Sequence, residues 1–181
     1  MIGNDIIDLA LAGKESNWQR KGFLDKIFTP REQLLISNSQ NPETTVWNLW
    51  SRKEATYKIY NRLTQKRAFI PQQLECFDLE IKKGIIYGKV ICYEAVYFTK
   101  TIITSEYIET DAVLNSQDFD KIKTIDSSQN IIKNNGIPNY FDSEDSIWKP
   151  ISKSHHGRFE RIISFHDICV SKIKTSKYGN E

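Results

Sequence analysis

Two charged residues on one predicted helix have the types and spacing that phosphate chemistry needs. Glu54 and Lys58 lie four positions apart in residues 47–58, where tryptophan, alanine and tyrosine recur at helical spacings. On a helix these two side chains project from the same side, with about 5–6 Å between their Cβ atoms. The plainer interpretation is an exposed ion pair worth about 0.3–0.5 kcal/mol. The alternative is a site at which Glu54 holds a divalent metal ion and Lys58 holds a phosphate group.

The surrounding sequence predicts the elements that would position this pair. Thr29, Pro30 and Glu32 form a capping box, which predicts the start of a short helix. From residue 77 the hydrophobic period changes from helical to two, which is typical of strands. Asp5 and Asp8 lie among aliphatic residues, and we interpret them first as acids at the start of a helix. The predicted helices span residues 29–37, 44–63 and 119–125, and the predicted strands span residues 77–82, 90–97, 100–108, 147–152 and 159–165, with 154–157 as the last loop.

Length and composition predict one α+β domain, with an antiparallel sheet packed on a long helix. We place the domain at residues 1–170 and a polar tail at 171–181. The 181 residues are 39% hydrophobic and 27% charged, as in ordinary globular proteins. A net charge of +2 argues against a general nucleic-acid binder, and no apolar run is long enough to span a membrane. Three cysteines without a CxxC pair, and no leader sequence, predict a cytoplasmic protein.

Three motifs in this order resemble the 4′-phosphopantetheinyl transferase superfamily, in particular its short holo-acyl-carrier-protein synthase type. They are Gly3-Asn-Asp5, Lys53-Glu-Ala-Thr-Tyr-Lys58 and Ser152-Lys-Ser-His155, with Gly136-Ile-Pro138 just before the last. The resemblance covers residues 1–63 well and 136–165 moderately, whereas no motif covers 85–135. It implies a 4′-phosphopantetheinyl transferase-like fold and an Mg²⁺-dependent enzyme. That enzyme would move phosphopantetheine from coenzyme A to a serine of an apo acyl carrier protein and release adenosine 3′,5′-bisphosphate.

The resemblance also implies roles for individual residues. Asp5 and Glu54 would hold the metal, consistent with the preference of Mg²⁺ for one or two carboxylates plus phosphate oxygens and water. Glu54, Lys58 and His155 would be catalytic, the last two by stabilising phosphate charge. Asp8 is a weaker candidate for the metal site. The coenzyme A contacts would come from Lys53, Lys58, Gly136, Pro138, Ser154, His155 and Arg158.

Several points stay open on the sequence alone. The family's Gly-Lys-Pro is Gly-Ile-Pro here, so a phosphate contact is missing at Ile137 or is supplied by Arg158. This departure supports the alternative of a non-catalytic module that binds a carrier protein or nucleotide. The resemblance also implies a homotrimer as a candidate assembly, in which His155 meets the carboxylates of a neighbouring subunit. Carrier proteins are acidic, so we expect docking on the exposed basic residues Lys14, Arg20, Lys21 and Lys26.

Overall fold

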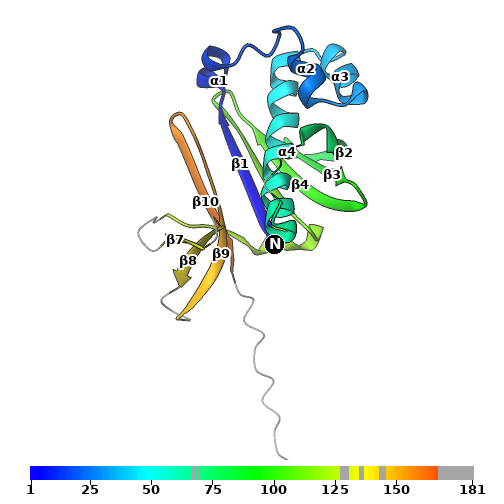
Figure 1. The fold of residues 1–181 in the computed structure, drawn as a ribbon. Coiled ribbons are helices and arrows are strands. Elements are labelled where there is room, and N and C mark those ends of the chain that lie inside the picture. The colour runs from blue at the N-terminus through cyan, green and yellow to red at the C-terminus, as the bar shows by residue number, and fades with distance from the viewer. Residues whose placement is uncertain (67, 69, 127–130, 135–136, 143–145, 167–181) are drawn as a thin grey trace, which may run out of the picture.

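The longest helix, α4 (Pro42–Thr64), lies across one face of an antiparallel sheet (Figure 1). Asn41 caps its start by accepting a hydrogen bond from the Thr44 amide, and Pro42 occupies the first turn. Gln65 ends it in the left-handed conformation, at φ 57°. The computed structural model describes residues 1–66, 68, 70–126, 131–134, 137–142 and 146–166. Within them the fold is α+β, as predicted, and none of the helices is long and apolar enough to cross a membrane.

The sheet under α4 has the strand order β1-β5-β4-β3-β2, and every neighbouring pair is antiparallel. Its outermost strand on one side is β1, which pairs with β5 so that Asp5 lies opposite Thr110. The apolar side chains between α4 and this sheet form the core. The strands are β1 (Ile2–Asp8), β2 (Leu74–Lys82), β3 (Ile85–Cys92), β4 (Ala95–Ile103) and β5 (Tyr107–Val113).

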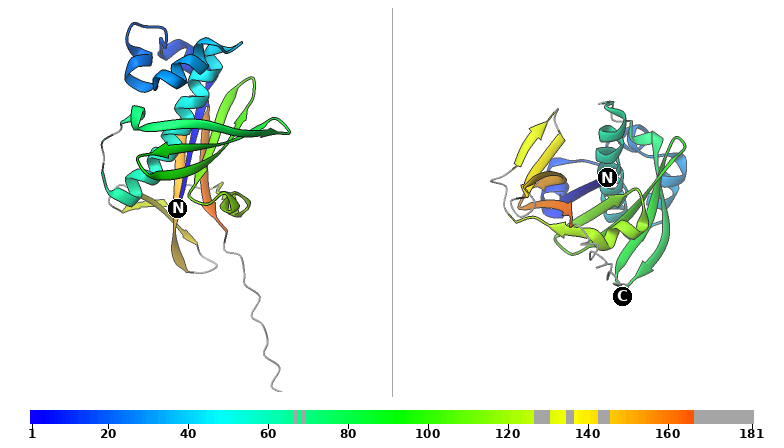
Figure 2. Two further views of the ribbon diagram at one scale, coloured as in Figure 1. Left: turned by 90° about the vertical axis from the view of Figure 1, so that its right-hand side faces the viewer. Right: turned by 90° about the horizontal axis from the view of Figure 1, so that it is seen from below.

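A second sheet, with the order β6-β10-β9-β8-β7, covers the side of β1 that faces away from α4. Both Figure 1 and the view from below in Figure 2 show β1 between α4 and the β9–β10 pair. The strands are β6 (Ile122–Thr124), β7 (Ile131–Asn134), β8 (Ile137–Asp142), β9 (Ile147–His156) and β10 (Phe159–Phe165).

Strand β1 can contact both layers because alternate side chains of a strand point to opposite faces. Gly3 lies against α4 so closely that a Cβ there would be 2.0 Å from the Ala55 carbonyl oxygen. On the other face, the Asn4 amide N–H donates to Ser152 Oγ at 2.9 Å, and Asn4 Nδ2 donates to Ser154 Oγ at 2.9 Å. One strand therefore ties the long helix to the second sheet.

Short helices gather at the end of the molecule where α4 begins (Figure 1). The capping box is confirmed: Thr29 Oγ1 accepts from the Glu32 amide, and the Glu32 carboxylate accepts from the Thr29 amide. Besides α4, the elements outside the sheets are α1 (Leu9–Glu15), α2 (Phe23–Ile27), α3 (Pro30–Ser37) and the 3₁₀ turns η1 (Pro71–Gln73) and η2 (Ser116–Lys121).

Five local predictions were wrong, and one of them is the strand expected at 100–108, which a turn at residues 104–106 divides between β4 and β5. Residues 2–8 form a strand rather than the start of a helix, although Asp8 does cap α1. The strand predicted at 90–97 is interrupted by a turn at Tyr93, whose φ is 53°. Residues 119–125 form the end of η2 and β6 instead of a helix, and His155 and His156 lie in β9 rather than in a loop. The tail predicted at 171–181 lies outside the described residues.

Candidate functional site

The Asp5 carboxylate is held at the junction of β1 and α4 with little solvent around it. Its side chain is 14% exposed, and Oδ2 is buried without a hydrogen-bond partner among the described residues. The nearest cation is the Lys58 ammonium, at 3.9 Å from Oδ1. Burial raises the pKa of Asp5 to about 6, even though Lys58 acts in the opposite direction. The site thus holds a carboxylate that would be stabilised by additional positive charge.

Glu54 lies with Asp5 in the lining of one cavity of about 280 Å³, here called the carboxylate cavity. Burial, followed by the negative charge of Asp5, raises the pKa of Glu54 to about 7. The predicted convergence of these two residues is therefore present in the structure. The cavity is completed by Ile6, Ile7, Ala12, Ser16, Phe23, Trp47, Trp50, His155 and His156.

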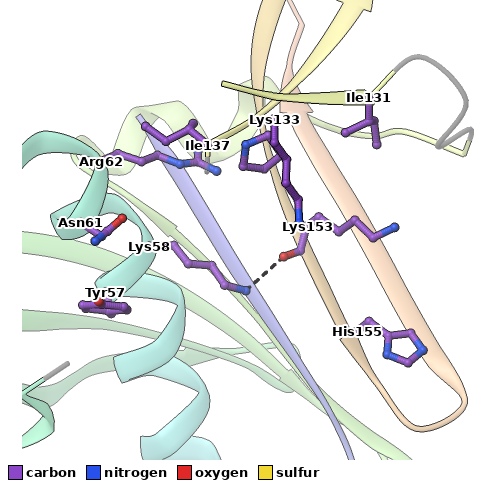
Figure 3. Close-up of a pocket in the computed structure, with 10 residues that line it drawn as sticks. Tyr57, Lys58, Asn61, Arg62, Ile131, Lys133, Ile137, Lys153 and His155 are labelled. Carbon is purple, nitrogen blue, oxygen red and sulfur yellow. Dashed lines mark hydrogen bonds between the residues drawn. The ribbon is translucent and has the colours of Figure 1, made fainter. Parts of the chain in front are cut away.

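Lys58 connects this region to a second cavity of about 370 Å³, here called the basic cavity (Figure 3). Its ammonium donates to the carbonyl oxygens of Asn4, at 2.5 Å, and of Lys153, at 3.3 Å. These bonds fix the cation between α4, β1 and β9. The other residues that line the basic cavity are Tyr57, Asn61, Arg62, Ile131, Lys133, Ile137, Pro138, Lys153 and His155.

His155 lines both cavities and comes from the same chain as Asp5 and Glu54. The homotrimer that the resemblance implies stays a prediction, but His155 of the same chain already lies beside these carboxylates. The physical reason is the second sheet, whose strand β9 is hydrogen-bonded through Ser152 and Ser154 to Asn4. This contact brings His155 alongside β1 without a partner chain.

The turn that follows His155 is fastened to the end of β1. Arg158 donates to Asp8 three times: Nε at 2.9 Å, Nη2 at 3.0 Å and its own amide at 3.1 Å. His156 Nδ1 accepts from the Asp8 amide at 2.9 Å. The Arg158 guanidinium holds the pKa of Asp8 well below its usual range. Asp8 is thus engaged in an ion pair and a helix cap, so its carboxylate is not available as a metal ligand.

Three residues expected to contact coenzyme A line neither of the two cavities. Lys53 is fully buried, and its ammonium contacts Glu32 Oε2 at 2.7 Å and donates to two backbone carbonyls. Ser154 is buried against Asn4. Arg158 lies at a separate surface hollow with Asp8. Pro138, by contrast, does line the basic cavity, and Gly136 lies outside the described residues.

Sequence reasoning missed the basic residues that strands bring to the basic cavity. Lys133 comes from β7 and Lys153 from β9, while Arg62 follows Lys58 by one turn of α4. Only Arg62 had a usable signal, because positions four apart on a helix share a face. Nothing near Lys133 in the sequence indicates which strand it pairs with or which cavity it reaches.

The four predicted docking residues are exposed on or beside α1 and α2. Lys14, Arg20, Lys21 and Lys26 all lie on this surface. Phe23 in the same segment lines the carboxylate cavity, so the basic surface forms part of the surroundings of the site. This arrangement leaves the docking prediction open to test.

The lining of the carboxylate cavity suits a small divalent cation that keeps some water ligands, rather than a structural metal ion held entirely by protein side chains. Among the described residues, no cluster of three or more potential protein ligands is present. Asp5 and Glu54 nevertheless supply two carboxylates with raised pKa values and one unpartnered buried oxygen. Mg²⁺ commonly uses one or two carboxylates and completes its shell with phosphate oxygens and water.

Comparison with known proteins identifies the family of this chain. Residues 1–114 match the family model described as the 4′-phosphopantetheinyl transferase superfamily. Two relatives are the holo-(acyl-carrier-protein) synthases of Campylobacter jejuni subsp. jejuni serotype O:23/36 (strain 81-176) and subsp. doylei (strain ATCC BAA-1458 / RM4099 / 269.97). Each is 35% identical over 82 residues, which is 45% of this chain and 63% of the relative. The alignment thus spans less than two thirds of their length.

Proposed function

The chain belongs to the 4′-phosphopantetheinyl transferase superfamily, and from this premise we propose that it transfers 4′-phosphopantetheine from coenzyme A to a serine of an apo acyl carrier protein. One observation carries the proposal: a cavity with several basic and no acidic residues among the described residues that line it adjoins a cavity with two carboxylates, and His155 lines both. A pyrophosphate fits such a boundary, because its oxygens need cations on one side and its reacting phosphorus must be reached by the acceptor serine.

The reaction exchanges one phosphorus–oxygen bond for another. The serine oxygen attacks the phosphorus that carries the pantetheine arm, and the bond from this phosphorus to the bridging oxygen breaks. Adenosine 3′,5′-bisphosphate leaves with the electron pair of that bond. Lys58 and His155 would stabilise the negative charge that develops on the phosphate oxygens.

Glu54 would accept the proton of the serine hydroxyl. Burial and the charge of Asp5 raise the pKa of Glu54 to about 7 in the metal-free chain, and bound Mg²⁺ would lower it again and so keep the carboxylate ionised and able to accept the proton. Asp5 and Glu54 would also hold Mg²⁺, which when bound neutralises charge on the pyrophosphate. Trp50 and Phe23 give the carboxylate cavity part of its apolar lining, which would limit the access of solvent to the carboxylates.

The carrier protein would approach over Lys14, Arg20, Lys21 and Lys26. These exposed cations belong to the same segment as Ser16 and Phe23, which line the carboxylate cavity, and an acidic partner would be steered toward them. The family relationship and the absence of a membrane-crossing helix among the described residues are compatible with a cytoplasmic enzyme. We propose separately that one chain suffices for activity, because its own His155 lines the cavity that holds Asp5 and Glu54.

The test is incubation of the chain with coenzyme A, Mg²⁺ and several apo carrier proteins, followed by intact mass measurement. We expect one phosphopantetheine arm on one carrier protein, and none when its acceptor serine is replaced by alanine. Glu54→Gln should abolish the mass shift, because it removes both the base and a metal ligand. Coenzyme A binding without transfer to any carrier protein would favour the non-catalytic binding module instead.

A further inference from the structure

The described residues that line the basic cavity carry more positive charge than their described neighbours neutralise. Lys58, Arg62, Lys133 and Lys153 line it, together with His155, and none of the lining residues in the described part of the chain is acidic. The remaining walls are apolar or aromatic, from Tyr57, Ile131, Ile137 and Pro138. Cations beside flat apolar walls suit a nucleoside phosphate, whose base packs on the walls while its phosphates meet the charges.

Three of the four cations are engaged by other groups. Arg62 donates from Nη1 to the Ile2 carbonyl at 2.9 Å and from Nη2 to the Ile151 carbonyl. Lys153 points its ammonium away from the cavity and pairs with Glu160 at 2.7 Å (Figure 3). Lys58 is held by two carbonyls and by the Asp5 carboxylate. Arg62 therefore ties β1 to β9, whereas Lys58 marks the end of the cavity next to the carboxylates.

Lys133 is the exception. It is exposed, and within the described part of the chain its ammonium makes no hydrogen bond or ion pair. Figure 3 shows it extending from β7 toward the space in front of Lys153 and Lys58. In the β7–β8 pairing it lies directly opposite Pro138, one position from Ile137. Position 137 carries no cation, but Lys133 on the facing strand can supply one to the same cavity.

We propose that Lys133 binds the ribose 3′-phosphate of coenzyme A and so supplies the contact that Ile137 cannot make. This inference rests on the proposed use of coenzyme A. The pyrophosphate belongs at the end near Lys58, because the carboxylates are there. Lys133 enters from another wall, where the remaining phosphate of coenzyme A can reach it. Arg158, the candidate that the sequence suggested for this role, is engaged by Asp8 outside the cavity.

The experiment compares coenzyme A with 3′-dephospho-coenzyme A by calorimetric titration, which needs no carrier protein. In Lys133→Ala we expect coenzyme A to bind about tenfold or more weakly, the usual effect of losing a hydrogen bond to a charged group. The affinity for 3′-dephospho-coenzyme A should stay within about twofold of the wild type, since that ligand lacks the phosphate. Lys82→Ala, which removes an exposed lysine at the β2–β3 hairpin, is the matched charge control and should change neither affinity.

A second variant tests whether a lysine on β8 can replace Lys133 on β7. Lys133→Ala combined with Ile137→Lys should restore discrimination between the two ligands, because Ile137 also lines the basic cavity, although it pairs with Asn134 rather than with Lys133. Equal weakening of both ligands in Lys133→Ala, or no recovery in the double variant, would overturn the inference. These failures differ from failure of the proposed function, in which the wild-type chain would bind no coenzyme A or transfer nothing.

Discussion

Asp5→Asn should make the protein more stable at alkaline pH, because it removes a charge that folding buries at a cost. The pKa of Asp5 rises from an ordinary 3.8 to about 6 in the folded chain, chiefly through burial. At roughly 1.36 kcal/mol per pKa unit, this shift lowers the free energy of unfolding by about 3 kcal/mol once Asp5 is ionised. The folded wild type holds its proton more tightly than the unfolded chain, so its stability falls as pH rises from about 4 to 6.

The variant lacks this pH dependence at position 5. We therefore expect Asp5→Asn to match the wild type near pH 4 and to exceed it by up to about 3 kcal/mol at pH 8. Urea unfolding followed by tryptophan fluorescence measures the difference, provided that the slope m stays constant. Asp120→Asn, at an exposed carboxylate, is the control and should show no such trend. A variant that is no more stable than the wild type at pH 8 would refute the reasoning.

The same variant tests the metal without any transfer assay. Millimolar Mg²⁺ should raise the melting temperature of the wild type at pH 8, since a ligand that binds only the folded state stabilises it. It should do so less at pH 5, where Asp5 and Glu54 are largely protonated. Asp5→Asn should lose the Mg²⁺ effect. An equal response of both proteins would mean that the ion binds elsewhere.

Three other substitutions separate structural residues from functional ones. Lys53→Met should cost about 3–5 kcal/mol in urea unfolding, because Glu32 is left buried without its partner, while the Michaelis constant for coenzyme A stays the same in the folded fraction. Arg158→Ala should increase amide hydrogen exchange in the β9–β10 turn and weaken coenzyme A binding, because Asp8 no longer holds that turn. Lys21→Glu with Lys26→Glu should raise the Michaelis constant for the carrier protein and flatten its salt dependence, leaving coenzyme A unaffected.

Each of these has an outcome that contradicts it. A stable Lys53→Met protein with poor coenzyme A binding would return Lys53 to the substrate site. Weaker coenzyme A binding in Arg158→Ala with unchanged exchange would indicate a direct phosphate contact. If the charge reversals raise both Michaelis constants, or neither, the basic segment is only a solvated surface, and Lys82→Glu serves as the control for net charge.

Local sequence signals predicted the elements that depend on local physics. The capping box and the hydrophobic period located α3 and α4, and the convergence of Asp5 on Glu54 followed from motifs carried by β1 and α4. Strand β1 itself was missed because both of its faces are buried, so it lacks the alternation of a half-exposed strand. The turn at Tyr93 was missed because neither glycine, asparagine nor proline marks it.

The roles of neighbouring lysines could not be separated by sequence either. Lys53 and Glu54 are adjacent, but successive positions on a helix point about 100° apart. Lys53 consequently turns toward Glu32 and the backbone of β2, while Glu54 turns toward Asp5. The basic cavity depends on the pairing of β7 with β8 and of β8 with β9, which only the folded chain reveals.

The geometry of β1 explains why Gly3 and Asp5 lie two residues apart. A one-residue slip of a strand exchanges its two faces. In β1 such a slip would put a side chain where only Gly3 fits against the Ala55 carbonyl, so the glycine fixes the position of the strand on α4. Asp5, two residues later, must then face the same helix, and Asn4 between them must face the second sheet. The spacing that places the Asp5 carboxylate beside Lys58 therefore also turns the opposite face of β1 toward β9, the strand that carries His155.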